Sequence, residues 1–369
     1  MKIAYYIYWL DDIESGVIKK INDQINYWVQ QGNDVKLFVL TKQGSSLERS
    51  LLNRKKKINY EIEIVPFSNK IKYVSKGFTI NGKIKKYNPD IIYMRESKIT
   101  PGIFKLIKDN KTILELNSIT KEEEVNSFNL GNIYNKFSNY YKFKYVDGFV
   151  AVTSEIGKHD SIKKYNKPTE IIGNGIDLLS NKPLDNNSDK TQVNLVFIGS
   201  DNQKWHGINK IIELSKIKKK WNFHIIGISN NLDKLDNVKF YGMLSKEEYL
   251  KIFSQMDVAI GTLALYRIKL YEACPLKTRE YLARGLPIII GYDDVDFPNE
   301  YDFLCKIENN KNNIKKNINK IEDFVQKWKN KRIDNTKISH LDVSFKEKKR
   351  LTFFEEILYN EKYKNIIRD

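Results

Sequence analysis

The stretch Glu272-Ala-Cys-Pro-Leu-Lys-Thr-Arg-Glu280-Tyr-Leu-Ala-Arg-Gly-Leu-Pro287 predicts a loop, a short helix and a strand, in that order. Pro275 suits the first position of a helix, and Gly285 supplies a stop after a run of good helix formers. The apolar run from Pro287 to Gly291 then indicates a buried strand. Units of this kind build α/β folds, in which helices cover a largely parallel sheet.

The predicted start of this helix has the chemistry of an anion site. A helix start presents unpaired backbone N–H groups and the positive end of the helix dipole, which suit a phosphate. Lys277 adds a full charge at that end. Glu272 precedes the helix, and Glu280 lies about one turn inside it. One carboxylate can therefore meet each end of a ligand whose middle is anionic, as in a sugar–diphosphate–ribose compound.

Length and composition limit the classes of protein that remain. A chain of 369 residues exceeds one ordinary domain, and 41% hydrophobic residues suffice for two cores. No run approaches the roughly 20 apolar residues of a membrane span, and the first residues suggest a strand instead of a signal peptide. We therefore expect a cytoplasmic protein. Two cysteines, Cys274 and Cys305, make no disulfide framework.

The formal net charge of +17 is spread over both halves of the chain. It suits an anionic ligand, an anionic membrane surface or nucleic acid, and a lysine-rich soluble surface explains it as well. Basic runs occur at 54–57 and 83–86. The 22 tyrosines are scattered among apolar strand positions and do not alternate with a basic run, which weakens the nucleic-acid alternative.

Strands and helices alternate twice along the chain, with a polar segment at 181–192 that suggests a linker. Ser154 is expected to cap a helix. The first turn between strand and helix holds one glycine, Gly16, and no Gly-x-Gly-x-x-Gly, which argues against a dinucleotide-dependent oxidoreductase. The predicted strands cover 2–10, 34–40, 61–65, 91–94, 112–116, 148–153, 170–172, 193–198, 223–226, 238–241, 258–260 and 287–291.

The pair Glu272-x7-Glu280, followed by a short helix and Gly-Leu-Pro, resembles the donor site of the family 4 (group 1) glycosyltransferases. That resemblance implies the GT-B fold: two Rossmann-like domains facing across a cleft, with the C-terminal helix returning to the first domain. It implies an acceptor-side domain over 1–185, a nucleotide-sugar domain over 190–343 and a returning helix over 344–369. Asn174-Gly-Ile-Asp177 resembles the segment that closes the first domain in this family.

Two further segments are similar to donor-site segments of the family. In the loop from Gly199 to Gly207, glycine lets backbone approach a phosphate. The family usually has an arginine and a lysine where this chain has Ser200 and His206, with Lys204 nearby, so the cation that meets the diphosphate stays open. Phe240–Ser245 resembles the segment bordering the nucleobase.

The resemblance implies transfer of a sugar from a UDP- or GDP-sugar with retention of configuration and with neither metal ion nor cofactor. The implied acceptor is a bacterial surface glycan, free or linked to a polyprenyl diphosphate, with the enzyme peripheral on the inner face of the membrane. The implied catalytic residues are Glu272, Lys204 and Lys277. The implied donor-binding residues are Gly199, Ser200, His206, Gly242, Met243, Pro275, Leu276, Thr278 and Glu280.

The acceptor side is predicted at the carboxyl edge of the first sheet, where ligands bind in open α/β folds. The candidates there are Gly16, Glu96 and Asn117. Many family members have a histidine near Asn117, and this chain has none there. The cluster Asp293–Asp296 is interpreted as a solvated loop, because it follows the predicted strand 287–291, which itself comes after the helix that starts at Pro275. Histidines and cysteines show no zinc spacing.

Two alternatives from other classes remain. A non-catalytic sugar-nucleotide-binding protein of the same fold would bind the donor without turnover. A basic nucleic-acid-binding protein would shift random oligonucleotides in a salt-dependent way.

Overall fold

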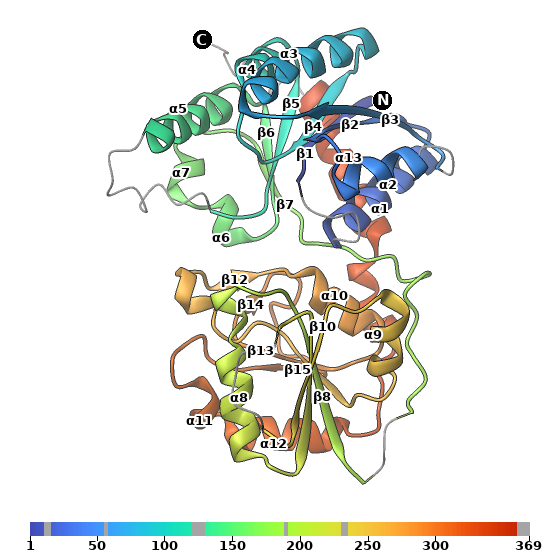
Figure 1. Ribbon diagram of the computed structural model, residues 1–369, viewed down its shortest axis with the longest axis vertical. Coiled ribbons are helices and arrows are strands. Elements are labelled where there is room, and N and C mark those ends of the chain that lie inside the picture. Colours follow the sequence, from blue (N-terminus) through green and yellow to red (C-terminus); the bar gives the residue numbers. More distant parts are fainter. Residues whose placement is uncertain (11–15, 55–57, 120–129, 188–190, 230–234, 360–369) are drawn as a thin grey trace. The chain divides into compact units, whose positions relative to one another are not determined.

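The computed structural model describes residues 1–10, 16–54, 58–119, 130–187, 191–229 and 235–359. The chain forms two compact units (Figure 1), one of Met1–Gly173 together with the chain from Val343 onward, and one of Asn174–Asp342. Each unit has its own parallel sheet and its own hydrophobic core.

The sheet of the first unit has seven parallel strands in the order β3-β2-β1-β4-β5-β6-β7. The chain moves outward from β1 to β3 and then places β4 on the other side of β1, as in a Rossmann-like sheet. The predicted α/β class is confirmed in this unit. The strands are β1 Lys2–Tyr8, β2 Asp34–Lys42, β3 Glu61–Phe67, β4 Ile91–Arg95, β5 Thr112–Leu116, β6 Gly148–Ala151 and β7 Thr169–Ile171.

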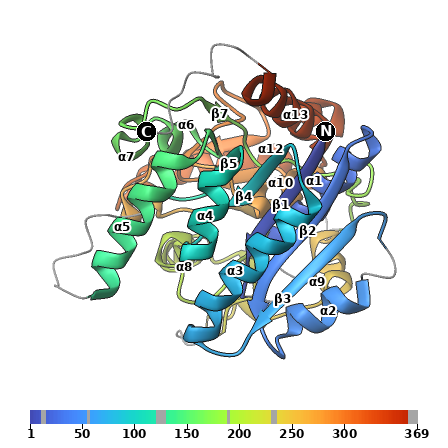
Figure 2. The same cartoon turned by 90° about the horizontal axis from the view of Figure 1, so that it is seen from above.

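Alternation along β1 explains how this sheet supports two helical layers. Ile3, Tyr5 and Ile7 face a core shared with α1, α2 and α13, whereas Ala4 and Tyr6 face a core shared with α3, α4 and α5. Figure 2 shows α3, α4 and α5 side by side. The helices are α1 Gly16–Gln30, α2 Ser46–Arg54, α3 Lys70–Tyr87, α4 Pro101–Asp109, α5 Leu130–Tyr145, α6 Ser154–Gly157, α7 Asp160–Lys163 and α13 Val343–Tyr359.

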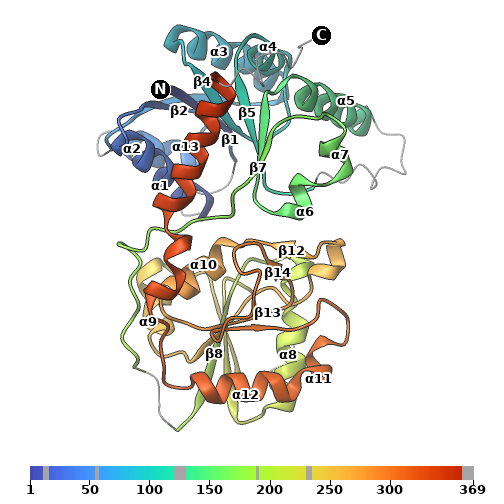
Figure 3. The same ribbon diagram turned by 180° about the vertical axis from the view of Figure 1, so that it is seen from behind.

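The last described helix, α13, packs on the first unit beside α1 (Figure 3), which confirms the expected return. Buried polar contacts hold it there. The indole Nε1 of Trp28 donates to Glu347 Oε2 at 2.9 Å, and Arg350 Nε donates to the Tyr93 hydroxyl at 3.0 Å. The ring of Phe354 contacts those of Trp28 and Tyr93. These contacts carry α13 across the face of the sheet that also holds α1.

The sheet of the second unit has six parallel strands in the order β10-β9-β8-β11-β13-β15, which is again Rossmann-like. A separate short pair joins β12 Glu272–Ala273 to β14 Asp293–Asp294. The main strands are β8 Val193–Ile198, β9 Trp221–Ile226, β10 Val238–Gly242, β11 Val258–Ile260, β13 Ile288–Ile290 and β15 Leu304–Lys306. The helices are η2 Lys204–His206, α8 Ile208–Ile217, α9 Lys246–Phe253, η3 Leu265–Ile268, α10 Leu276–Ala283, α11 Asn313–Lys316, α12 Ile318–Trp328 and η4 Asn335–Leu341.

The division between the units falls after Gly173, ahead of the polar segment 181–192 suggested as the linker. Backbone and side-chain hydrogen bonds fix the start of that segment to the second unit. Arg284 donates to Asn181 Oδ1 at 2.9 Å, and the Leu184 N–H donates to the Arg284 carbonyl oxygen at 3.1 Å. Composition marks a polar surface segment, and in this chain that segment is bound to one unit.

Local differences from the sequence-based prediction are small. Thr153, not Ser154, caps α6, because its side chain accepts from the Ile156 N–H at 3.3 Å. Helix α2 and the short strands β12, β14 and β15 were not predicted. The strands hold only two or three residues each, too few to show a period.

Candidate functional site

Helix α10 begins at Leu276, one residue later than the sequence suggested, with Pro275 at its N-cap. Proline has no N–H, and the Thr278 N–H and hydroxyl both donate to the Pro275 carbonyl oxygen, at 3.2 and 2.9 Å. Of the positions 275–278, Pro275 therefore has no N–H to offer, and the N–H of Thr278 is already bonded. The N–H groups of Leu276 and Lys277 are the ones that this first turn can offer.

The ammonium of Lys277 projects from this first turn into a buried position. Its Nζ lies 4.1 Å from the centroid of the Phe197 ring, and within the described parts of the chain it has neither hydrogen-bond nor ion-pair partner. Burial lowers the pKa of Lys277 to about 7. A buried cation without a counter-charge is unfavourable. The position is therefore suited to an anion that arrives from outside the protein.

His206 lies beside this cation. The imidazole is 9% exposed; burial and then the charge of Lys277 lower its pKa to about 3, so the ring is neutral near pH 7. Its Nδ1 is buried, and no described residue bonds to it. A Cβ at Gly199 would lie 2.8 Å from that nitrogen and 2.6 Å from the Phe197 ring, so only glycine fits. We call Phe197, Gly199, His206 and Lys277 the Lys277 cluster.

Three glycines draw the carboxyl ends of β8, β9 and β10 together. The Gly199 N–H donates to the Ile226 carbonyl oxygen at 3.0 Å, and the Gly227 N–H donates to that of Gly242 at 2.6 Å. A Cβ at Gly227, where φ is +78°, would lie 2.0 Å from the Gly199 carbonyl oxygen. Gly242 is thus linked to the Lys277 cluster through backbone. Met243, which follows it, is 84% exposed.

The two glutamates of the key stretch lie on different elements. Glu280 on α10 accepts at Oε1 from the Tyr249 hydroxyl of α9 at 2.9 Å, and no described residue hydrogen-bonds its Oε2. Glu272 lies on β12, where it pairs with Asp293 of β14. Both side chains are partly exposed. Ser200 and Lys204 are exposed, and the Lys204 carbonyl oxygen accepts from Arg267 at 2.8 Å.

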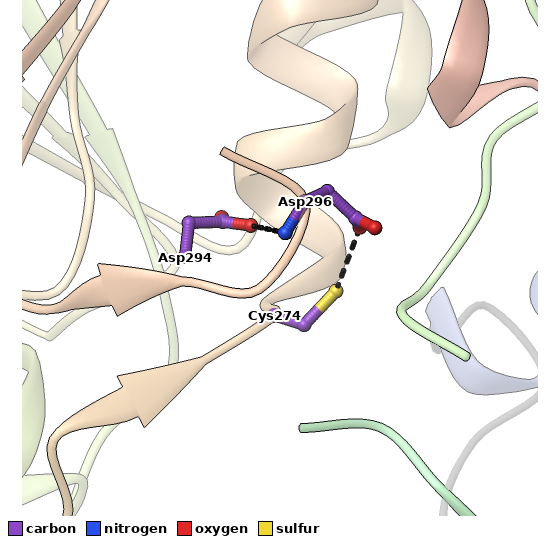
Figure 4. Close-up of side chains that lie close together, drawn as sticks. All are labelled: Cys274, Asp294 and Asp296. Carbon is purple, nitrogen blue, oxygen red and sulfur yellow. Dashed lines mark hydrogen bonds between the residues drawn. The ribbon is translucent and has the colours of Figure 1, made fainter. Parts of the chain in front are cut away.

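Cys274, Asp294 and Asp296 point toward one another (Figure 4), close enough to resemble a metal site. Arg279 fills that position instead. Its guanidinium donates to both oxygens of Asp294 at 2.6 and 2.7 Å, to Asp296 at 2.8 Å and to Cys274 Sγ at 2.8 Å. Burial raises the pKa of the Cys274 thiol to about 12. The interpretation of this aspartate cluster as a solvated loop is wrong, because Asp294 is buried in an ion pair.

Asn174, the first residue of the second unit, is hydrogen-bonded to Cys274 and Arg279. Its backbone N–H donates to Cys274 Sγ at 2.9 Å, its side-chain amide donates to the Cys274 carbonyl oxygen, and its own carbonyl oxygen accepts from Arg279 Nε at 3.1 Å. The Asn-Gly-Ile-Asp segment thus anchors the loop that leads into α10. The sequence suggested a domain-closing turn and did not indicate this contact.

In the first unit, the acceptor-side candidates Gly16, Glu96 and Asn117 lie at the carboxyl edge of the sheet, and Glu96 has a partner that the sequence did not predict. Gly16 is the first residue of α1. Glu96 lies 3.4 Å from the buried ammonium of Lys142, which also donates to the Ser97 carbonyl oxygen at 3.0 Å. Asn117 Nδ2 is buried, and no described residue bonds to it. Residues 11–15, which lie between the first strand and Gly16, and residues 55–57 of the basic run 54–57 lie outside the described residues.

The structure joins some of the predicted residues and reveals others. Gly199, His206, Gly242 and Lys277 are linked through contacts, whereas Ser200, Lys204 and Met243 are exposed around them. Phe197, Arg279, Tyr249 and Lys142 were not proposed. Arg279 had a readable signal, since an arginine in the key stretch and acidic residues after the next strand are complementary. The others depend on which strands become neighbours.

Comparison with solved structures gives matches over the whole chain. A glycosyltransferase from Rickettsia africae ESF-5 is 15% identical with a TM-score of 0.67, covering 98% of this chain and 100% of that one. The Anabaena protein HepE, solved with UDP and glucose, is 11% identical with a TM-score of 0.62, covering 95% and 99%. The UDP-GlcNAc 2-epimerase from Neisseria meningitidis, bound to UDP-GlcNAc, is 11% identical with a TM-score of 0.55, covering 96% and 100%.

No family model and no curated protein sequence matches the chain. The structural matches are too distant in sequence to show more than architecture. Together with the two Rossmann-like sheets, they show that this chain has the GT-B fold.

Proposed function

We propose that this protein is a glycosyltransferase that moves a sugar from a UDP- or GDP-sugar to a glycan or lipid-linked glycan, with retention of configuration. The observation that carries the proposal is the buried ammonium of Lys277 at the first turn of α10, to which no described residue offers a hydrogen bond or a counter-charge. A nucleotide diphosphate would supply the missing counter-charge. As the diphosphate leaves the sugar, negative charge grows at the position that this ammonium and the Leu276 and Lys277 amides can stabilise.

The remaining residues fit supporting roles in the same proposal. Glu280, oriented by Tyr249, would accept hydrogen bonds from the ribose, and Glu272 would hold sugar hydroxyls. Exposed Met243 and the Gly242 backbone would border the base. Neutral His206 would contribute a hydrogen bond and no charge, which leaves Lys277 as the main diphosphate cation and Lys204 as a second one. The transfer would need no metal, since protein cations serve the leaving group.

The deciding experiment measures UDP and GDP binding by calorimetry. The wild type should bind one of them, and Lys277→Met should weaken that affinity roughly ten- to a hundredfold, because a charge-assisted hydrogen bond is worth about 1.5–3 kcal/mol. Lys251→Met is the matched control, since it removes an exposed lysine on α9. The proposal fails if neither nucleotide binds, or if Lys277→Met binds as the wild type does.

Turnover separates the proposed activity from its alternatives. Incubation with a panel of nucleotide sugars should release nucleotide diphosphate, and the amount should rise with a suitable acceptor. Binding without turnover would indicate a non-catalytic sugar-nucleotide-binding protein. Conversion of a UDP-sugar to its epimer without any acceptor would indicate an activity like that of the Neisseria match.

Peripheral contact with an anionic membrane is part of the proposal and is supported by an uneven distribution of charge. Helices α3, α4 and α5 contain eleven lysines and one aspartate, whereas α1, α2 and α13 contain eight basic and five acidic residues. Ile71, Phe78 and Phe137 are exposed in the lysine-rich layer. Basic helices with exposed apolar side chains suit an anionic lipid surface. Among the described residues, every helix is too short or too polar to span a membrane.

Flotation with vesicles tests this surface. Vesicles containing phosphatidylglycerol should retain the protein at low salt, whereas neutral phosphatidylcholine vesicles should not. A salt-dependent shift of random oligonucleotides in place of lipid binding would favour the nucleic-acid alternative.

A further inference from the structure

The first unit has its own topological switch point, where β1 and β4 are neighbours. From β1 the chain runs outward through β2 and β3, and from β4 it runs the other way through β5, β6 and β7. The loops at the carboxyl ends of two such strands diverge, and ligands bind in open α/β sheets at that point. The residues that follow β1, β4 and β5 are therefore the ones to examine for binding chemistry.

Each of these three strands is followed by a side-chain donor that lacks a partner. They are Trp9 Nε1 after β1, Ser97 Oγ after β4 and Asn117 Nδ2 after β5. All three atoms are buried, and the described residues offer none of them a hydrogen bond. A buried unmade hydrogen bond costs about 1–3 kcal/mol, so three on adjacent strands are unusual. An indole N–H can only donate, which indicates a ligand that accepts hydrogen bonds.

The charges of the described side chains at this edge do not balance. Glu115 near the end of β5 is fully buried and meets two cations: Lys20 contacts Oε1, and Arg95 Nη1 lies 3.6 Å from Oε2. Lys142 and Glu96 nearby compensate each other. Among these described side chains, one positive charge is therefore left over. The guanidinium of Arg95 lies 5.5 Å from the centroid of the Trp9 ring and keeps 15% of its side chain exposed, so it is the accessible cation.

Helix α1 adds positive potential to the same edge. A helix that follows a strand in a right-handed parallel unit begins at the carboxyl end of that strand. Helix α1 has fifteen residues, starts at Gly16 and has no acidic residue in its first turn. Its N-terminal dipole end is therefore not offset by an acidic side chain of that turn.

We propose that this edge of the first unit binds a carboxylate or phosphate group, with Arg95 as its cation and Trp9, Ser97 and Asn117 as neutral donors. The ligand would be an anionic sugar or phosphate group of the acceptor, and that assignment rests on the proposed transferase function. Arginine recognises planar or tetrahedral oxyanions through paired N–H groups, which a neutral sugar hydroxyl does not match. The proposal therefore predicts selection of a charged acceptor over an uncharged one.

Two indole groups make the test direct, because Trp9 lies at this edge and Trp205 lies in η2 beside His206 of the Lys277 cluster. The full-length protein is labelled with ¹⁵N, and the indole signals are assigned with Trp9→Phe and Trp205→Phe. Sodium glucuronate, inorganic phosphate and neutral glucose are titrated separately at fixed ionic strength. Glucuronate, phosphate or both should move the Trp9 signal saturably, and glucose should not.

Variants decide whether the cation and donors named here cause that shift. Arg95→Gln and Asn117→Leu should each weaken binding of the active anion about tenfold or more. Arg49→Gln, which removes an exposed arginine on α2, should leave it unchanged. Asn117→Leu keeps the test decisive if Arg95→Gln does not fold. A response to glucuronate alone assigns a sugar carboxylate, and a response to phosphate alone assigns a phosphate.

The proposal is overturned if no anion moves the Trp9 signal, if glucose moves it equally, or if both variants bind as the wild type does. UDP provides the separate check on the donor site, because it should move the Trp205 signal. If UDP did not move the Trp205 signal while the anion moved the Trp9 signal as expected, the proposed function would be contradicted and the anion site would still be supported.

Discussion

The carboxyl edges of the two sheets each bury a charged side chain, and described residues of opposite charge meet it in the first unit but not in the second. In the first unit, the buried carboxylate of Glu115 meets Lys20 and Arg95, and although burial alone would raise its pKa, these cations lower it to about 2. In the second unit, the ammonium of Lys277 meets no described anion, and burial lowers its pKa to about 7. The strand orders match at their first six positions, so the topology does not decide this difference.

The comparison shows how to separate structural charges from ligand-binding charges. Buried ions that compensate each other need nothing further, and removal of one leaves the other exposed to a low dielectric. A buried ion without compensation weakens the free protein and is favoured only when a ligand brings the counter-charge. The cluster of Arg279 with Asp294 and Asp296 shows that the second unit also compensates buried ions where no ligand is expected.

The largest expected effect comes from removing the buried carboxylate of Glu115. Glu115→Gln should lower the free energy of unfolding by about 3–5 kcal/mol at pH 7, because it leaves Lys20 and Arg95 without the counter-charge of Glu115. Denaturant unfolding followed by tryptophan fluorescence measures this. Glu61→Gln on β3 is the matched control, since it breaks the exposed pair with Lys36 and should cost less than about 1 kcal/mol.

The pH dependence of that effect has a fixed sign. The folded-state pKa of Glu115 lies below its ordinary value, so its contribution is present above pH 4.5 and is lost as pH falls toward 2. The stability difference between wild type and Glu115→Gln should therefore shrink over that window. If that stability difference stayed constant from pH 7 to pH 3, it would contradict the interpretation that Lys20 and Arg95 lower the pKa of Glu115.

The second effect concerns Glu272 and Glu280, the two glutamates that flank Lys277 in the sequence. Glu280→Gln should reduce nucleotide-diphosphate affinity roughly ten- to a hundredfold, because a charged acceptor for the ribose is lost. Glu272→Gln should lower the transfer rate and leave the affinity for free nucleotide diphosphate nearly intact. Calorimetry and a transfer assay measure the two. If both variants kept the wild-type affinity and the wild-type transfer rate, the stretch 272–287 would not be the donor site.

A smaller effect sharpens the interpretation of Lys277. Since its pKa is about 7 in the free protein, binding of a diphosphate above that pH must take up a proton. Affinity should fall by up to about tenfold per pH unit between pH 7 and 8.5. Lys277→Arg should bind with a flat profile over the same range, because arginine stays charged. Identical profiles for the two proteins would show that Lys277 does not titrate in the binding step.

The smallest expected effect is that of a chelator. Arg279 already holds the carboxylates of Asp294 and Asp296, so EDTA should leave both stability and the proposed transfer within error of the untreated protein. The measurement is thermal unfolding and transfer rate with and without EDTA. Activity that disappears with EDTA and returns with manganese or magnesium would contradict the metal-free proposal.

Much of the fold was predictable from local pattern. Largely apolar runs of three to nine residues marked the main strands, and Gly285, with φ of +81°, ends α10 as its position indicated. The boundary of the second unit was less predictable, because the polar segment near Asn181 gains its hydrogen bonds from Arg284, about a hundred residues away. Composition indicates exposure, and it does not indicate which unit supplies the partners.

The amino-acid pattern alone specified the two α/β series, the order of loop, helix and strand around Lys277, and the places of Glu272 ahead of α10 and Glu280 inside it. Which of these charges are compensated depends on contacts between elements that are distant in the sequence. Lys277 and Arg279 stand two residues apart on one helix, yet one faces the Phe197 ring and the other faces Asp294. Positions two apart on a helix point in nearly opposite directions, and the partner each side chain meets depends on which strand folds against that face.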